Sequence, residues 1–286
     1  WAVDGTFACS PSQFQQLYVL MYAVDGAIGE GQSFFPGAWC LLEHKDTVTY
    51  MTLFSEIRNL LIERGLNASV EVVHSDFERS AINSLRSSFD GVRVCGCHFH
   101  FGQRIWRWVQ ESGYVVMYRT APDVRRFIRL MIALPFLPSA RIQANFEMVV
   151  EFTTEEQQEN GCFLALVNSF AEYFTSTWLP LSVVLSVHGC AHRTNNGCES
   201  YHGRTTRQLQ AHKPGIYKFI SHIKTEDAYF ERRLAQINSG MARIERRTRY
   251  VVLDEKIQHL QDRMGAGELD EISYLAQISD LLTTLD

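Results

Sequence analysis

The chain has 286 residues, 46% of them hydrophobic and 21% charged, a balance typical of a soluble globular protein. No run of about 18 residues is uninterruptedly apolar, which excludes a hydrophobic membrane-spanning helix. The formal net charge is −5, yet residues 193–249 hold twelve Lys and Arg against five Asp and Glu, a local excess of +7. This segment suits a polyanionic substrate, although an ordinary solvated helical face explains the same excess.

The first part of the chain has the pattern of an antiparallel meander. Residues 1–8, 18–24 and 38–42 are apolar and predict three strands. Polar segments rich in Gly, Pro and Ser separate them, predicting a turn at 10–13 and a loop at 29–33.

The hydrophobic period then changes to that of a helix. Apolar residues at i, i+3 and i+4 predict a helix over 50–61, ended by Gly65, and a second helix follows over 77–88. Strands are predicted at 70–75 and 92–95. The order β-β-β-α-β-α-β is that of ribonuclease H-like folds, in which the first and fourth strands lie side by side in a five-stranded mixed sheet.

Beyond Cys97 the pattern is mainly helical, with helices predicted at 101–111 and 123–134. The stretch of sequence between Asp76 and Glu199 contains far more residues than two helices and a strand require. We therefore predict a helical insertion in an α/β core. The predicted parts are 1–112 (first part of the core), 113–190 (all-helical insertion), 191–250 (last part of the core) and 251–286 (two amphipathic C-terminal helices).

Three acidic residues have settings that suggest chemistry. Asp4 lies within an apolar strand, where an unpaired charge is costly, Asp76 ends a strand, and Glu199 follows the turn-forming Asn195-Asn-Gly. If the three carboxylates meet, they offer the oxygen ligands that Mg²⁺ or Mn²⁺ prefers. Two such ions can promote in-line displacement at phosphorus. For any one of these acids, a helix cap or a satisfied turn residue is the plainer interpretation.

A cluster of thiols and imidazoles follows the fifth predicted strand, in the segment Cys95-Gly-Cys97-His98-Phe-His100. Four ligands within six residues cannot easily surround one ion, so we favour a structural role over a zinc site. His100 is then expected to open the next helix and to pack near the active site or a DNA strand. His202 shares a helix face with Glu199, and a core or capping role is its alternative.

Several basic and aromatic side chains are candidates for DNA contact. Trp106 and Trp108 could stack on an unpaired base, although core packing is the alternative for each. The candidates for phosphate contact are Arg104, Arg107, Arg193, Arg204 and Arg207.

Four ordered motifs give the chain a resemblance to the catalytic domain of the Mutator-like element (MULE) transposases. They are Asp4-Gly-Thr-Phe7, Asp76-Phe-Glu78, Cys97-His-Phe-His100 followed by Gln103, and Asn195-Asn-Gly-Cys-Glu199-Ser-Tyr-His202. The resemblance runs from residue 1 to about residue 250. It implies a ribonuclease H-like DDE fold with Asp4, Asp76 and Glu199 as catalytic metal ligands for two Mg²⁺ or Mn²⁺ ions. It further implies cut-and-paste transposition of DNA, a homodimer or larger synaptic complex, and a nuclear location in a eukaryotic host.

Two other functions stay open on the sequence. A domesticated descendant could keep the fold and regulate transcription without transposing, and loss of one acid would favour it. Another ribonuclease H-like nuclease, such as an RNA/DNA hybrid cleaver, would lack the long insertion. The seven scattered cysteines favour a reduced, intracellular protein over a disulfide framework. The opening strand without Met suggests a piece of a longer protein, in which the family's upstream DNA-binding domain would precede it.

Overall fold

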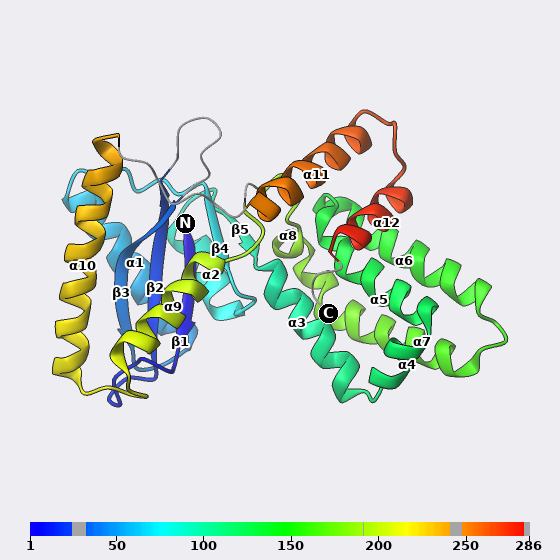
Figure 1. Cartoon of the computed structure of the whole chain (residues 1–286), viewed down its shortest axis with the longest axis horizontal. Coiled ribbons are helices and arrows are strands. Elements are labelled where there is room, and N and C mark those ends of the chain that lie inside the picture. Colours follow the sequence, from blue (N-terminus) through cyan, green and yellow to red (C-terminus); the bar gives the residue numbers. More distant parts are fainter. Residues whose placement is uncertain (25–32, 191, 241–247, 283–286) are drawn as a thin grey trace. The chain divides into compact units, whose positions relative to one another are not determined.

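The computed structural model describes residues 1–24, 33–190, 192–240 and 248–282. It is a mixed α/β protein whose contacts divide it into two units (Figure 1). The sheet unit comprises Trp1–Val94 and Thr194–Arg246, and the helical unit comprises Cys95–Arg193 and Arg247–Asp286. Of the loop predicted at 29–33, residues 29–32 lie outside the described part.

The sheet has five strands in the order β3-β2-β1-β4-β5 (Figure 1). β1 pairs antiparallel with β2 and parallel with β4, as the sequence predicted for the first and fourth strands, and β2 pairs antiparallel with β3. The parallel pair is set by Ala2 opposite His74. The strands are β1 (Ala2–Thr6), β2 (Gln16–Val24), β3 (Ser33–Leu42), β4 (Val72–Ser75) and β5 (Arg93–Gly96).

β3 begins five residues before the strand predicted at 38–42. The sequence there contains Pro36-Gly37, which favours a turn when read alone. In the sheet, β3 lies at the edge, and its register with β2 shifts so that Leu20 faces Ala38 while Met21 faces Pro36. An edge strand with a bulge tolerates proline because its missing N–H is not needed by an inner neighbour.

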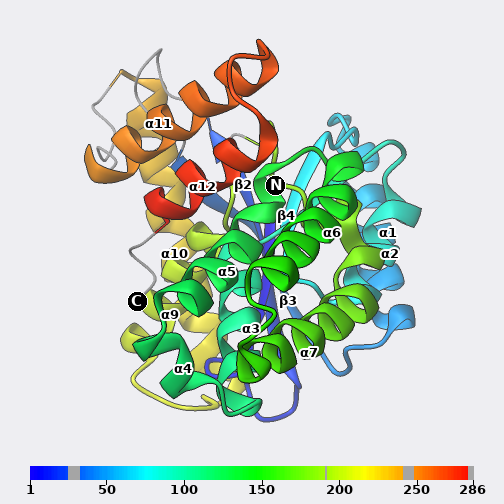
Figure 2. The same cartoon turned by 90° about the vertical axis from the view of Figure 1, so that its right-hand side faces the viewer.

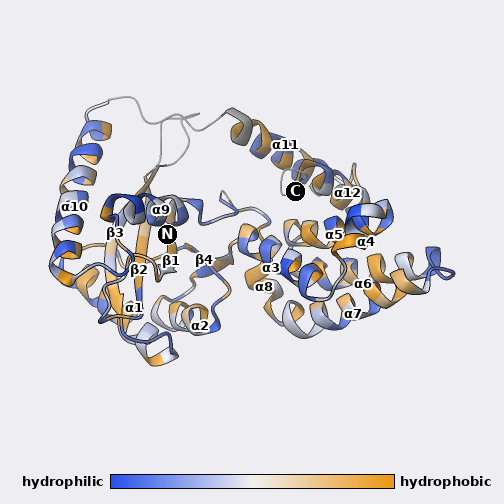
Figure 3. Ribbon diagram, turned by 60° about the horizontal axis from the view of Figure 1, so that its bottom comes forward, coloured by the Kyte–Doolittle hydropathy of each residue, from blue (hydrophilic) through white to orange (hydrophobic). Residues whose placement is uncertain are grey.

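Two layers of helices enclose the sheet. α1 (Thr47–Glu63) and α2 (Arg79–Ser88) lie on one side, and α9 (Asn196–Leu209) lies on the other (Figure 3). The alternation along β2 explains this: Tyr18 faces Tyr50 and Phe54, whereas Val19 belongs to a core with Tyr201 of α9. Phe219 of α10 (Ile216–Asn238) joins the same core as Val19.

The helical unit packs around aromatic side chains. Phe101, Phe127, Phe170 and Phe174 are buried and in ring contact with one another or with Trp178. Its helices are α3 (His98–Glu111), α4 (Val115–Thr120), α5 (Pro122–Ala133), α6 (Ser139–Glu156), α7 (Gly161–Thr177), α8 (Ser182–Leu185), α11 (Thr248–Gly265) and α12 (Glu271–Leu281), with 3₁₀ turns at Leu134–Phe136 and Leu179–Leu181.

The C-terminal helices belong to the helical unit. α12 packs on α5 (Figure 2). Glu271 at its start accepts hydrogen bonds from Arg141 at 2.6 Å and from Asn145 at 2.6 Å, and the hydroxyl of Tyr274 donates to the carbonyl of Phe136 at 3.2 Å. The unit therefore combines two stretches of chain that sequence reading treated as separate. No helix in the described residues is long and apolar enough to cross a membrane.

Candidate functional site

Asp4 lies on β1, and Asp76 directly follows the neighbouring parallel strand β4. Ala2 is opposite His74, and Asp4 and Asp76 each follow two residues later. If this register continued past the end of β4, Asp4 and Asp76 would be level and on the same face. Adjacent strands are about 4.8 Å apart, within reach of one shared cation. Asp4 is only 9% exposed, and Asp76, the first residue after β4, is half-buried.

The turn after β4 separates the roles of the two acids in Asp76-Phe-Glu78. Oδ1 of Asp76 accepts the backbone N–H of Glu78 at 3.2 Å, which fixes the turn into α2. The carboxylate of Glu78 accepts a hydrogen bond from the hydroxyl of Tyr50 at 2.9 Å and lies 3.1 Å from Nζ of Lys45. Glu78 is thus held in a structural network, and Asp76 is the acid at the strand end.

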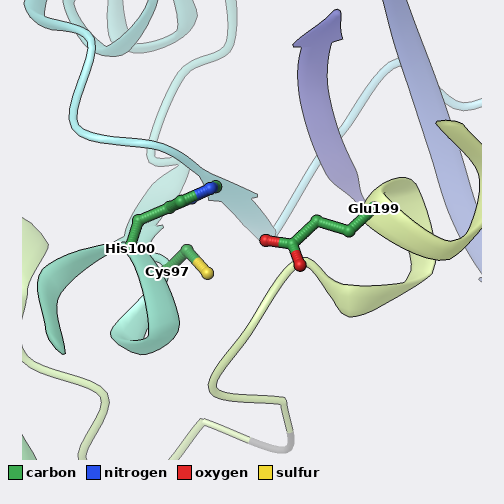
Figure 4. Close-up of side chains that lie close together, drawn as sticks. All are labelled: Cys97, His100 and Glu199. Atoms are coloured by element: carbon green, nitrogen blue, oxygen red, sulfur yellow. The ribbon is translucent and has the colours of Figure 1, made fainter. Parts of the chain in front are cut away.

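Glu199 projects from the first turn of α9 (Figure 4). A carboxylate is favoured there because the helix N-terminus carries partial positive charge. One turn later, Nδ1 of His202 lies 3.3 Å from Oδ2 of Asp4. Residues three apart share a helix face, so the face of α9 that carries Glu199 is the one that meets Asp4. We call Asp4, Asp76 and Glu199 the acidic triad.

The electrostatic surroundings are negative. Burial raises the pKa of Tyr18 well above its usual value, and the nearby charges of Asp76 and Asp4 raise it further. Tyr18 therefore remains a neutral phenol at physiological pH. The acidic triad offers only oxygen donors, the type that a hard divalent cation prefers. Among the described residues its three carboxylates do not form a group whose ligand atoms all lie within 4.8 Å of one another.

Residues 1–104 match the family model of the MULE transposase domain. The resemblance inferred from the sequence motifs is confirmed over this part of the chain. The matched stretch includes Asp4, Asp76, Cys97 and His100, whereas Glu199 and the rest of the last motif lie beyond it. A comparison with curated proteins finds no match.

Within the match to the MULE transposase domain, the thiols and imidazoles of residues 95–100 have different partners. Sγ of Cys95 lies 3.1 Å from Sγ of Cys190, and Nε2 of His98 lies 2.9 Å from the carbonyl oxygen of Ile132. Sγ of Cys97 and a ring nitrogen of His100 lie within 4.8 Å of each other, and both side chains project from the start of α3 (Figure 4). The four groups do not converge on one point, as the short spacing predicted.

His98 is a structural residue. Its ring packs edge-on against Phe136, with ring centroids 4.9 Å apart. Burial, with a smaller effect of the Arg193 charge, lowers the pKa of His98 to about 4. The imidazole is neutral at physiological pH. His98 begins α3, two residues before the helix start predicted at His100.

The five candidate arginines have different surroundings. Arg193 forms an ion pair with Asp254 and lies over the ring of Phe136. Arg204 forms an ion pair with Glu226 at 2.6 Å. The side chains with exposed positions are those of Arg104, Arg107 and Arg207.

The two tryptophans of α3 are half-buried and contact aromatic rings of the helical unit. Trp106 contacts the ring of Tyr118, and Trp108 contacts the rings of Phe170 and Tyr173. These contacts agree with the core-packing alternative.

Sequence reading named His202 but not its partner, and it missed Glu226 and Asp254 as partners of arginines. Glu226 is 3% exposed although it lies mid-helix in α10. The only signal in the sequence is an acid on the apolar side of a helix, which is too common to single out a pair.

Proposed function

We propose that the chain is the catalytic domain of a DDE-type DNA transposase, with a ribonuclease H-like sheet unit. The observation that carries the proposal is the parallel register of β1 and β4. In it Ala2 is opposite His74, and Asp4 and Asp76 each follow two residues later, within the stretch that matches the MULE transposase domain. The contact of His202 with Asp4 supports Glu199 as the third acid, since the two α9 residues share a face.

The acidic triad would hold Mg²⁺ or Mn²⁺, two ions in the complete site. Such ions supply activation of an attacking oxygen and stabilisation of the leaving oxygen in displacement at phosphorus. The protein's part would be to present three carboxylates from a strand, a strand end and a helix of the sheet unit. A water would first hydrolyse the phosphodiester at the element end, and the freed 3′-hydroxyl would then attack target DNA.

The helical unit supports the same proposal. The chain leaves the sheet unit after Val94 and rejoins it at Thr194, just before the helix that carries Glu199. An all-helical insertion in this place is what the resemblance to MULE transposases implies. Arg104, Arg107 and Arg207, which are exposed, would grip DNA phosphates. We further propose a homodimer or larger complex, because two element ends must be joined, and a nuclear location in a eukaryotic host.

The test is cleavage of DNA carrying the element's terminal repeats by the full-length protein in Mg²⁺. Changing any one acid of the triad to its amide should abolish cleavage and leave the far-ultraviolet circular dichroism spectrum unchanged. Glu78→Gln is the matched control, because it alters a neighbouring acid that serves the fold. Cleavage near the parent rate by a triad variant would remove that acid from the site. DNA binding without cleavage by the parent would favour the domesticated transcriptional regulator instead.

A further inference from the structure

We infer that His202 is a positioning residue, which donates a hydrogen bond from Nδ1 to Oδ2 of Asp4 and so fixes the orientation of that carboxylate. The inference rests on the proposed function, in which Asp4 binds a metal ion. Nδ1 and Oδ2 are 3.3 Å apart, and the two side chains are only 10% and 11% exposed. Little water reaches the contact, so the orientation of Asp4 depends on the protein group beside it.

The contact specifies where the ring carries its proton. An ionised carboxylate can only accept a hydrogen bond, so an unprotonated Nδ1 would place lone pairs against each other at 3.3 Å. Nε2 of His202 is buried and has no hydrogen-bond partner among the described residues. A ring protonated at Nε2 alone would therefore bury an N–H group without an acceptor. A ring protonated at Nδ1 alone donates to Asp4 and buries no N–H group without an acceptor.

The location of His202 couples two ligands of the proposed site. Asp4 is mid-strand in β1, and Glu199 is one turn before His202 in α9. The hydrogen bond holds Asp4 from the same helix that supplies Glu199, so a shift of α9 would move both carboxylates together. Hydrogen bonds to a ligating carboxylate orient it, and their loss typically weakens metal binding by about 10–100-fold.

Two substitutions separate the hydrogen bond from the packing of the ring. His202→Phe keeps an aromatic ring beside Tyr201 but cannot donate, whereas His202→Asn places an amide N–H₂ near the position of Nδ1. Mn²⁺ affinity of the full-length protein, measured by electron paramagnetic resonance without DNA, should fall roughly 10–100-fold in His202→Phe. In His202→Asn it should remain close to the parent value. Equal affinity of His202→Phe and the parent would overturn the inference, as would equal weakening in both variants.

A second measurement does not depend on the variants' stability. In long-range ¹H–¹⁵N spectra of the parent with labelled histidine, the His202 ring should carry a proton on Nδ1 at neutral pH. A ring protonated only at Nε2 would overturn the inference. A different result would contradict the proposed function. If the parent bound no Mn²⁺, Asp4 would not be a metal ligand, and the positioning role of His202 would fail as well.

Discussion

Replacement of Arg204 by Met should destabilise the sheet unit strongly, because Arg204 is the partner of a buried acid. Its guanidinium lies 2.6 Å from Oε1 of Glu226, whose side chain is 4% exposed, while that of Arg204 is 30% exposed. The guanidinium also lies over the rings of Tyr229 and Phe230, 4.5 and 5.1 Å from their centroids. Arg204 on α9 thereby joins this helix to α10.

The difference in exposure between the side chains of Arg204 and Glu226 determines how much stability each substitution should cost. Arg204→Met leaves the Glu226 carboxylate buried without its cation, which costs about 3–5 kcal/mol of unfolding free energy. Glu226→Gln leaves a guanidinium that solvent can reach, so we expect a cost of about 1–2 kcal/mol. The double variant Arg204→Met with Glu226→Leu should lie within about 1 kcal/mol of the parent, because an apolar pair can replace a buried ion pair.

The assay is thermal and urea unfolding of the parent and these three variants. At roughly 2–4 °C per kcal/mol for a unit of this size, Arg204→Met should lower the midpoint by about 6–20 °C. The double variant should recover most of that loss. DNA binding at several salt concentrations should be measured in parallel. A small loss of stability together with a flatter salt dependence would refute the reasoning and show that Arg204 contacts phosphate, as sequence reading suggested.

Three further predictions concern other parts of the chain. Arg207→Ala should reduce the slope of log affinity for DNA against log salt concentration by about one, because a guanidinium bound to a phosphate releases about 0.9 of a counterion. An unchanged slope would exclude Arg207 as a phosphate contact. The pKa of His98, lowered to about 4, means that the unfolded chain takes up the proton first as the pH falls below about 6.5. Stability should therefore decline by about 3 kcal/mol between pH 6.5 and 4, and His98→Gln should flatten this decline in unfolding measured against pH; an equal decline in both proteins would contradict it. Oxidised glutathione should join Cys190 to Cys95, whose sulfurs are 3.1 Å apart, by two exchange steps that release two reduced glutathiones; mass spectrometry that finds only a glutathionylated Cys190 would contradict it.

The sequence by itself determined the local structure and the candidates for the site. The hydrophobic period changes where the strands of the meander give way to α1, and Asp46 provides the side-chain cap from which α1 begins. The apolar setting of Asp4 and the strand-end setting of Asp76 are local features too. A motif match needs only the order of residues along the chain, so the resemblance to MULE transposases also came from the sequence.

The tertiary structure decided the pairings between distant residues. Pro36 lies in a strand because β3 is at the edge of the sheet, a position that its own sequence does not encode. The expected alignment of Asp4 with Asp76 depends on the register of β1 with β4, in which Ala2 is opposite His74; a slip of one residue would turn one acid to the other face. Whether Arg204 meets Glu226 or a phosphate depends on how α9 packs on α10, because the charge of an arginine does not select its partner. The periodicity of apolar side chains is a property of a short segment, whereas these contacts join segments that only the fold brings together.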